Sequence, residues 1–173
     1  PIPILKISKT LRNIFCFQIR LLRNISYVIE LKSTLKANNL GRFKINLMHF
    51  DIAKRSAAGF AVRLVKKHMI IGLGTGSTAS IFVNMLAEVN KTESLDLIGV
   101  PTSEPTKILA KDLGIKLINL NEVEKIDMVF DGADEFDPFL NLIKGGGGAL
   151  LQEKIVAESA KEMIVIADES KKV

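Results

Sequence analysis

The strongest constraint on the fold of this 173-residue chain is an apolar run that leads into a glycine loop and then into an amphipathic segment. Residues 69–73 have the continuous apolar pattern of a buried strand, and residues 74–77 read Gly-Thr-Gly-Ser. The apolar residues that follow recur at helical spacing: Ile81, Phe82, Met85 and Leu86. The sequence therefore predicts a strand, a tight loop and a helix, which together begin a βαβ unit.

The same alternation continues toward the end of the chain. Short apolar runs predict further strands at residues 95–100, 115–120, 126–130 and 163–167. Longer runs predict helices at residues 104–113 and 149–161. This order predicts an α/β fold, a three-layer Rossmann-like sandwich with a mostly parallel sheet. In such sheets ligands bind beyond the carboxyl ends of the strands.

Charge divides the chain near residue 48. Residues 1–47 contain nine Lys or Arg residues and one acidic residue, whereas residues 48–173 contain 15 basic and 18 acidic residues. Regular patterning begins after Met48, where Asp51 is expected to cap a helix whose apolar positions include Ala57, Phe60, Ala61, Leu64 and Val65. We predict a basic N-terminal extension over residues 1–47, outside the fold, and a Rossmann-like domain over residues 48–173.

The extension has three interpretations: a targeting peptide, a basic arm for an anionic partner, or upstream sequence joined to a native start at Met48. The third is favoured, because Ile, Leu and Asn dominate the stretch, whereas transit peptides contain more Ser and Ala. At the other end, residues 168–173 directly follow a strand, so we expect the domain to be incomplete at its C-terminus.

Composition excludes several classes of protein. One cysteine, Cys16, permits no intramolecular disulfide, and a count of two histidines argues against a His-rich metal site or a Ser-His-Asp triad. No apolar run reaches 18 residues, so no membrane span is expected. The excess of acid over residues 48–173 argues against nucleic-acid binding.

The loop at residues 72–78 (Gly-Leu-Gly-Thr-Gly-Ser-Thr) joins a strand to a helix N-terminus. Free N–H groups and the helix dipole at such a place suit a phosphate, and Thr75, Ser77 and Thr78 add hydroxyl donors. The loop lacks the ending of a Walker A motif, and the third glycine of a dinucleotide fingerprint would fall at Ser77. Phosphate binding is favoured over a plain turn.

Two more motifs follow predicted strands. Asp131-Gly132-Ala133-Asp134-Glu135 places three carboxylates in five residues, suited to metal, sugar hydroxyls or acid–base chemistry, although a solvated acidic loop has the same composition. Residues 144–148 read Lys-Gly-Gly-Gly-Gly, where bare backbone lets a ligand approach closely beside a fixed positive charge.

Two single residues complete the candidate site. Glu153 has Leu150, Ala157 and Ala160 at helical spacing, and a carboxylate on such an apolar side tends to have a raised pKa. A surface glutamate with its carboxylate in water is the alternative, and it is favoured when this residue is taken alone. Lys171, after the last strand, is placed to reach an anion at the same sheet edge, although a solvated tail explains it equally well.

The ordered set Gly-Thr-Gly-Ser-Thr, Asp-Gly-Ala-Asp-Glu, Lys-Gly-Gly-Gly and Glu153 nine residues after Lys144 resembles the ribose-5-phosphate isomerase type A family. Ala-Asp-Glu-Ser-Lys at residues 167–171 is similar to a further stretch of that family. The resemblance runs from about Met48 to Val173 and makes residues 48–173 a catalytic domain. It also puts Lys54 where the family has a phosphate-contacting lysine.

The resemblance implies an aldose–ketose isomerase of the non-oxidative pentose phosphate pathway that interconverts D-ribose 5-phosphate and D-ribulose 5-phosphate through a cis-enediolate. It implies that Glu153 is the general base, that Asp131 assists ring opening, that Asp134 positions hydroxyls and that Lys144 stabilises the enediolate oxygen. The implied substrate-binding residues are Lys54, Thr75, Gly76, Ser77, Thr78, Asp131, Gly132, Ala133, Asp134, Lys144, Gly145, Gly146, Gly147 and Lys171.

The resemblance further implies no metal or organic cofactor, no nucleic-acid or membrane partner, a cytoplasmic location and a homodimer or homotetramer of the full-length protein. The family's C-terminal α+β lid domain has no counterpart here, and residues 1–47 have none in the family.

Two rival hypotheses remain open. A non-catalytic sugar-phosphate sensor of the same fold would not need Glu153 or Lys144, and a nucleotide-binding Rossmann domain fits the glycine loop poorly.

Overall fold

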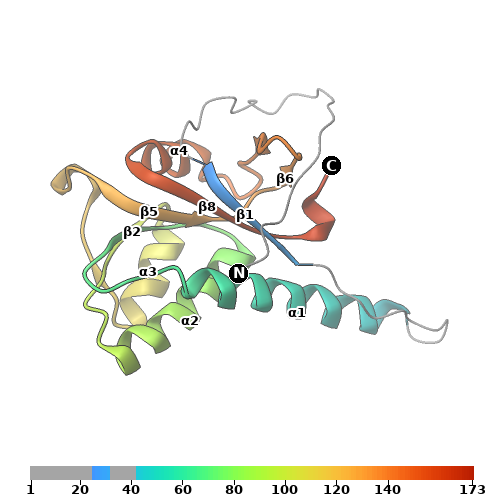
Figure 1. Cartoon of the computed structure of the whole chain (residues 1–173), viewed down its shortest axis with the longest axis horizontal. Helices are drawn as coiled ribbons and strands as arrows, with labels where there is room; N and C mark the ends of the chain where they lie inside the picture. Colours follow the sequence, from blue (N-terminus) through green and yellow to red (C-terminus); the bar gives the residue numbers. More distant parts are fainter. Residues whose placement is uncertain (1–24, 32–41) are drawn as a thin grey trace.

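The computed structural model describes residues 25–31 and 42–173 (Figure 1). A six-stranded sheet lies at its centre, and every pair of neighbouring strands is parallel. The strand order is β1 (Ile25–Leu31), β8 (Ala160–Asp168), β5 (Ile126–Asp131), β2 (Ile70–Leu73), β3 (Ile98–Pro101) and β4 (Lys116–Leu117). The predicted α/β fold with a mostly parallel sheet is confirmed.

Helices cover both faces of this sheet. Helices α1 (Arg42–Val62), α2 (Ser77–Glu93) and α3 (Glu104–Asp112) contribute to one apolar core, and α4 (Leu150–Glu158) contributes to a second. Figure 1 shows α1 and α2 on one side of the strands and α4 on the other. The sheet is therefore the middle of three layers, as parallel sheets require when both faces must be buried.

Continuous apolar runs place the central strands. Ile71 and Leu73 of β2 and Ile164 and Ile166 of β8 are fully buried, because strands covered on both faces have no solvent side. The first core also contains a stacked pair of rings, Phe82 of α2 and Phe130 of β5, with centroids 4.5 Å apart. This stack fixes α2 beneath the end of β5, next to the glycine loop.

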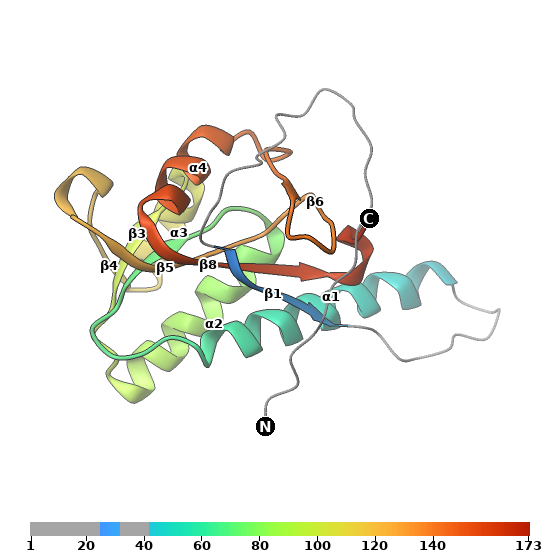
Figure 2. The ribbon, with the colours of Figure 1, turned by 45° about the horizontal axis from the view of Figure 1, so that its top comes forward.

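The N-terminal part differs from expectation. The boundary predicted at residue 48 falls inside α1, which begins at Arg42, and β1 pairs in parallel with β8 at the edge of the sheet (Figure 2). The helix cap predicted at Asp51 is wrong, because Asp51 lies within α1 and pairs with Arg55 one turn later at 2.9 Å. The division at residue 48 stays a prediction for residues 1–24 and 32–41, which lie outside the described residues.

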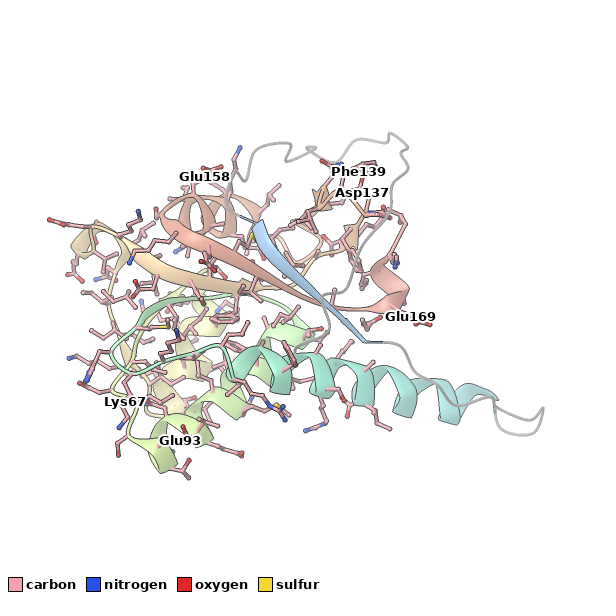
Figure 3. The ribbon with its side chains drawn as sticks, viewed as in Figure 1. Lys67, Glu93, Asp137, Phe139, Glu158 and Glu169 are labelled. Carbon is pink, nitrogen blue, oxygen red and sulfur yellow. The ribbon has the colours of Figure 1, made fainter. Side chains whose placement is uncertain are left out.

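A small hairpin was not expected from the sequence. Strands β6 (Glu135–Phe136) and β7 (Leu142–Ile143) pair antiparallel, and Asp137 closes their connection by accepting the N–H of Phe139 at 2.7 Å (Figure 3). Strands of two residues carry no readable alternation. The hairpin matters because it places the acidic loop before β6 beside the lysine after β7.

Other boundaries moved by a few residues. The strand predicted at 115–120 is only β4, because the 3-10 helix η1 (Leu120–Glu122) follows, with a capping box between Asn119 and Glu122. The helix predicted at 149–161 ends at Glu158, and β8 begins at Ala160. A second 3-10 helix, η2 (Glu169–Lys171), follows β8.

The strand order creates a switch point between β2 and β5. From β2 the chain moves outward to β3 and β4 on one side, then returns to β5 on the other. The loops that leave the two strands diverge there, and such points form ligand crevices. In the described part of the chain, each helix is too short or too polar to cross a membrane.

Candidate active site

The glycine loop leaves β2 and starts α2. Gly76 is the residue before the helix, with φ of 108°, a left-handed conformation that favours glycine. No side chain caps this helix end, so its first N–H groups are available to an anion. Lys54 of α1 donates from Nζ to Oγ of Ser77 at 3.1 Å, which brings a cation to the same place, and Thr78 is buried beneath it.

Asp131 ends β5 and faces this loop across the switch point. Its Oδ1 accepts the N–H groups of Thr75 at 3.0 Å and of Gly132 at 2.8 Å. The residue is 1% exposed. One oxygen of this carboxylate is therefore committed to holding the two loops together, and the other, Oδ2, faces the interior of the site.

Lys144 follows β7 and points its ammonium group into the same space. Its Nζ lies 2.9 Å from Oδ2 of Asp131 and 3.7 Å from Oε2 of Glu153, and it donates to the carbonyl of Gly132 at 2.6 Å. The three charged side chains are 4%, 1% and 6% exposed. We refer to Asp131, Lys144 and Glu153 as the buried triad.

Glu153 enters the triad from the first turn of α4. The apolar neighbours Val156 and Ala157 on the same helix are buried in the second core, so the helix face that carries Glu153 is turned inward. Its Oε2 is buried and has no hydrogen-bond partner. This oxygen therefore has an ion-pair partner in Lys144 at 3.7 Å but no hydrogen bond.

Burial raises the pKa of Glu153 above its ordinary range, and the negative charge of Asp131 raises it further, while Lys144 opposes both. Burial also raises the pKa of Asp131, against the attraction of Lys144 and the two N–H donors. One cation serves two carboxylates, so a proton is easily held by Glu153. This arrangement suits a group that both takes and returns a proton.

Asp134 ties the acidic loop to the glycine run after Lys144. Its Oδ2 accepts the N–H of Gly146 at 2.8 Å, and its own N–H bonds to the carbonyl of Ile143 at 2.8 Å. The glycine run turns at Gly145, whose carbonyl accepts the N–H of Gly148. Exposed backbone at residues 146–148 thus borders the triad.

The structure brings most of the predicted site residues to one edge of the sheet, but not all by direct contact. Lys171 lies in η2 at the carboxyl end of β8, half-buried, and among the described residues no polar contact joins it to the triad or to the glycine loop. Within the same residues there is no cluster of three or more His, Cys, Asp or Glu side chains that would hold a metal ion.

Three residues near the site were missed from the sequence. The hydroxyls of Thr102, Ser103 and Thr106 surround the hydroxyl of Thr75 at 2.7, 2.8 and 3.3 Å. A signal existed, because Ser103 caps α3 three residues before Thr106. In the sequence, Ser103 has the pattern of an ordinary helix start. Only the parallel pairing of β2 with β3 brings it to the glycine loop.

Gly74 lies where the glycine loop passes so close to β5 that there is no room for a side chain. A Cβ atom there would lie 2.5 Å from Cα of Asp131, and this backbone cannot move aside cheaply. We expect Gly74→Ala to lower the free energy of unfolding by about 3 kcal/mol, measured by urea denaturation. Gly59→Ala is the matched control, because a Cβ there meets only Sδ of Met85 at 3.8 Å in a helix. Equal stability of the two variants would contradict the close approach.

Comparison with known proteins assigns the family. The family model described as ribose 5-phosphate isomerase A (phosphoriboisomerase A) matches residues 98–173, which include all of the buried triad. This part of the chain belongs to the ribose 5-phosphate isomerase A family. Ribose-5-phosphate isomerase A of Ruegeria sp. is 54% identical over 128 residues, covering 74% of this chain and 49% of that relative.

Solved structures of family members agree with the fold. Ribose 5-phosphate isomerase A of Methanocaldococcus jannaschii matches with a TM-score of 0.68 and 50% identity over 69% of this chain and 53% of that one. A D-ribose-5-phosphate isomerase solved in complex with phospho-erythronic acid matches with a TM-score of 0.70 and 46% identity, covering 72% of this chain and 55% of that one. The chain spans about half the length of the relatives that it matches.

Proposed function

We propose that the protein interconverts D-ribose 5-phosphate and D-ribulose 5-phosphate. The observation that carries the proposal is the buried triad, in which Glu153 keeps an unbonded carboxylate oxygen 3.7 Å from Nζ of Lys144. The reaction needs a movable proton, a stabiliser of negative oxygen and a phosphate anchor. The family match and the relative solved with phospho-erythronic acid support a sugar phosphate as the ligand.

In this proposal Glu153 moves the proton. Its carboxylate takes the proton from C2 of the open-chain aldose. The electron pair of that C–H bond forms the C1=C2 double bond of a cis-enediolate, and the π electrons of the C1 carbonyl move onto O1. The ammonium group of Lys144 and the backbone N–H groups after it stabilise the oxygen on which charge develops. The protonated Glu153 then delivers the proton to C1. The proton of the C2 hydroxyl passes to O1, so that C2–O becomes the carbonyl of the ketose and the Glu153 carboxylate is restored.

The other site residues bind and prepare the substrate. Lys54, Ser77 and the N-terminus of α2 form the phosphate anchor, since they offer a cation, a hydroxyl and free N–H groups in one place. Lys171 reaches the phosphate from η2. Asp131 assists opening of the furanose ring, and Asp134 positions the sugar hydroxyls together with the loop that it bonds.

The proposal includes further properties of the protein as a whole. They are action without a metal or organic cofactor, a cytoplasmic location, the absence of nucleic-acid and membrane partners, and assembly as a homodimer or homotetramer. They rest on the resemblance to the family.

A turnover assay tests the proposal. The purified protein is incubated with ribose 5-phosphate and excess EDTA, and formation of ketopentose phosphate is followed. We expect turnover that EDTA does not reduce. Binding of ribose 5-phosphate without turnover would indicate a sugar-phosphate sensor instead, and turnover that EDTA abolishes would indicate a metal enzyme.

The pH profile should report the environment of Glu153. The base must be ionised to accept the C2 proton, and its pKa is raised above the ordinary 4.5 by burial and by Asp131. Activity should therefore be lost as pH falls, with the acidic limb of kcat/KM above pH 4.5. The substrate phosphate also titrates near pH 6 and could produce an acidic limb of its own. A ¹³C NMR titration of the Glu153 carboxyl therefore shows whether the limb belongs to Glu153. A Glu153 pKa at or below 4.5 would contradict the burial argument.

A further inference from the structure

Four hydroxyl groups gather where the glycine loop meets α3. We call Thr75, Thr102, Ser103 and Thr106 the hydroxyl cluster. Oγ1 of Thr75 lies 2.7 Å from Oγ1 of Thr102 and donates to Oγ of Ser103 at 2.8 Å. Thr102 is fully buried and Thr106 is 4% exposed, so these contacts form away from water.

The hydrogen bonds of the cluster begin and end in the glycine loop. Thr75 donates to Ser103, Ser103 donates to Oγ1 of Thr106 at 3.0 Å, and Thr106 donates to the carbonyl of Gly74 at 3.0 Å. Thr102 donates to the carbonyl of Leu73 at 3.0 Å. A run of hydrogen bonds in one direction strengthens each member, and here it closes on the residue that precedes Thr75.

The peptide group between Gly74 and Thr75 is therefore held at both ends. Its carbonyl accepts from Thr106 on α3, and its N–H donates to Oδ1 of Asp131 on β5 at 3.0 Å. The next residue, Gly76, opens α2 in a left-handed conformation without a side-chain cap. The direction of the free N–H groups at the start of α2 thus depends on a peptide that the hydroxyl cluster fixes.

We propose that Thr102, Ser103 and Thr106 are positioning residues that set the affinity of the glycine loop for the phosphate group of the substrate. They do not touch the phosphate themselves. They fix the Gly74–Thr75 peptide, and through it the N-terminus of α2. The inference rests on the proposed function for the identity of the substrate, but phosphate affinity is measurable without turnover.

Thr106→Val tests the proposal, because valine keeps the shape of threonine and removes the hydroxyl that holds the Gly74 carbonyl. We expect the dissociation constant for inorganic phosphate and the KM for ribose 5-phosphate to rise about tenfold, with kcat changed less than about threefold. Thr106→Ser restores the hydroxyl and should restore both values. Thr92→Val is the matched control, since its hydroxyl bonds only within α2.

The outcomes separate this inference from the proposed function. Unchanged phosphate affinity in Thr106→Val, or equal losses in Thr106→Val and Thr106→Ser, would overturn the positioning role. If Thr106→Val does not fold, Ser103→Ala breaks the same run of hydrogen bonds and should weaken phosphate binding, and wild-type affinity in that variant would overturn the proposal. A wild-type protein without turnover would sink the isomerase assignment, and the phosphate constants would still decide the role of the cluster.

Discussion

Replacement of Glu153 by glutamine should reduce kcat by about 10³-fold while leaving KM nearly unchanged. Glutamine has the same shape, but it cannot accept the proton from C2. The side chain is 6% exposed, so water cannot easily replace it as the base. The change also removes one of the two carboxylates that share the ammonium group of Lys144, and we therefore expect the variant to be folded.

The matched control is Glu158→Gln at the exposed end of the same helix (Figure 3). It makes the same chemical change outside the site and should keep wild-type kcat. Substrate binding to both variants is measured by ³¹P NMR with ribose 5-phosphate. Wild-type turnover by Glu153→Gln would remove Glu153 from the mechanism.

Replacement of Lys144 by methionine should have the largest effect on stability. The change leaves Asp131 and Glu153 buried without a cation, and breaking a buried ion pair in this way costs about 3–5 kcal/mol. Methionine retains most of the apolar stem, so lost packing contributes little. We expect the free energy of unfolding, measured by urea denaturation at neutral pH, to fall by about that amount, and turnover to fall with the loss of the oxyanion stabiliser.

The loss should depend on pH in a defined direction. Without Lys144 the folded-state pKa values of both carboxyls rise further above their unfolded values. The folded state then holds extra protons, so its stability is present at low pH and is lost as pH rises through the raised pKa values. The deficit of Lys144→Met should therefore grow with pH. Lys154→Met, an exposed lysine on α4, is the control, and an equally small loss in both variants would contradict the burial of the pair.

Local patterns predicted the layers of the fold because the central strands are buried on both faces. The run at residues 69–73 predicted β2, and the acidic and glycine motifs fell at the ends of β5 and β7. The strand at Ile25–Leu31 was missed because its register is set by β8, more than 130 residues away. The hairpin β6–β7 was missed because each strand has only two residues.

In the site, too, features set by neighbouring residues could be predicted from the sequence, whereas features set by tertiary contacts could not. The spacing around Glu153 indicated an apolar helix side, but for a lone glutamate it favoured a surface position, and the structure buries the residue. The pairing of Lys144 with Asp131 could not be read from the sequence, because it depends on the hairpin that brings residue 144 back toward the end of β5. The hydroxyl cluster was missed because β2 and β3 must first lie side by side. Roles in catalysis follow from chemistry and stay predictions until they are measured.

The most direct measurement compares ribose 5-phosphate turnover and binding in the wild-type protein and in Glu153→Gln, with EDTA present. The buried triad predicts that both proteins bind the sugar phosphate with similar affinity and that only the wild type forms ribulose 5-phosphate. Binding by both with turnover by neither would contradict the isomerase assignment and favour a sugar-phosphate sensor, and turnover by both would show that the reaction does not use Glu153.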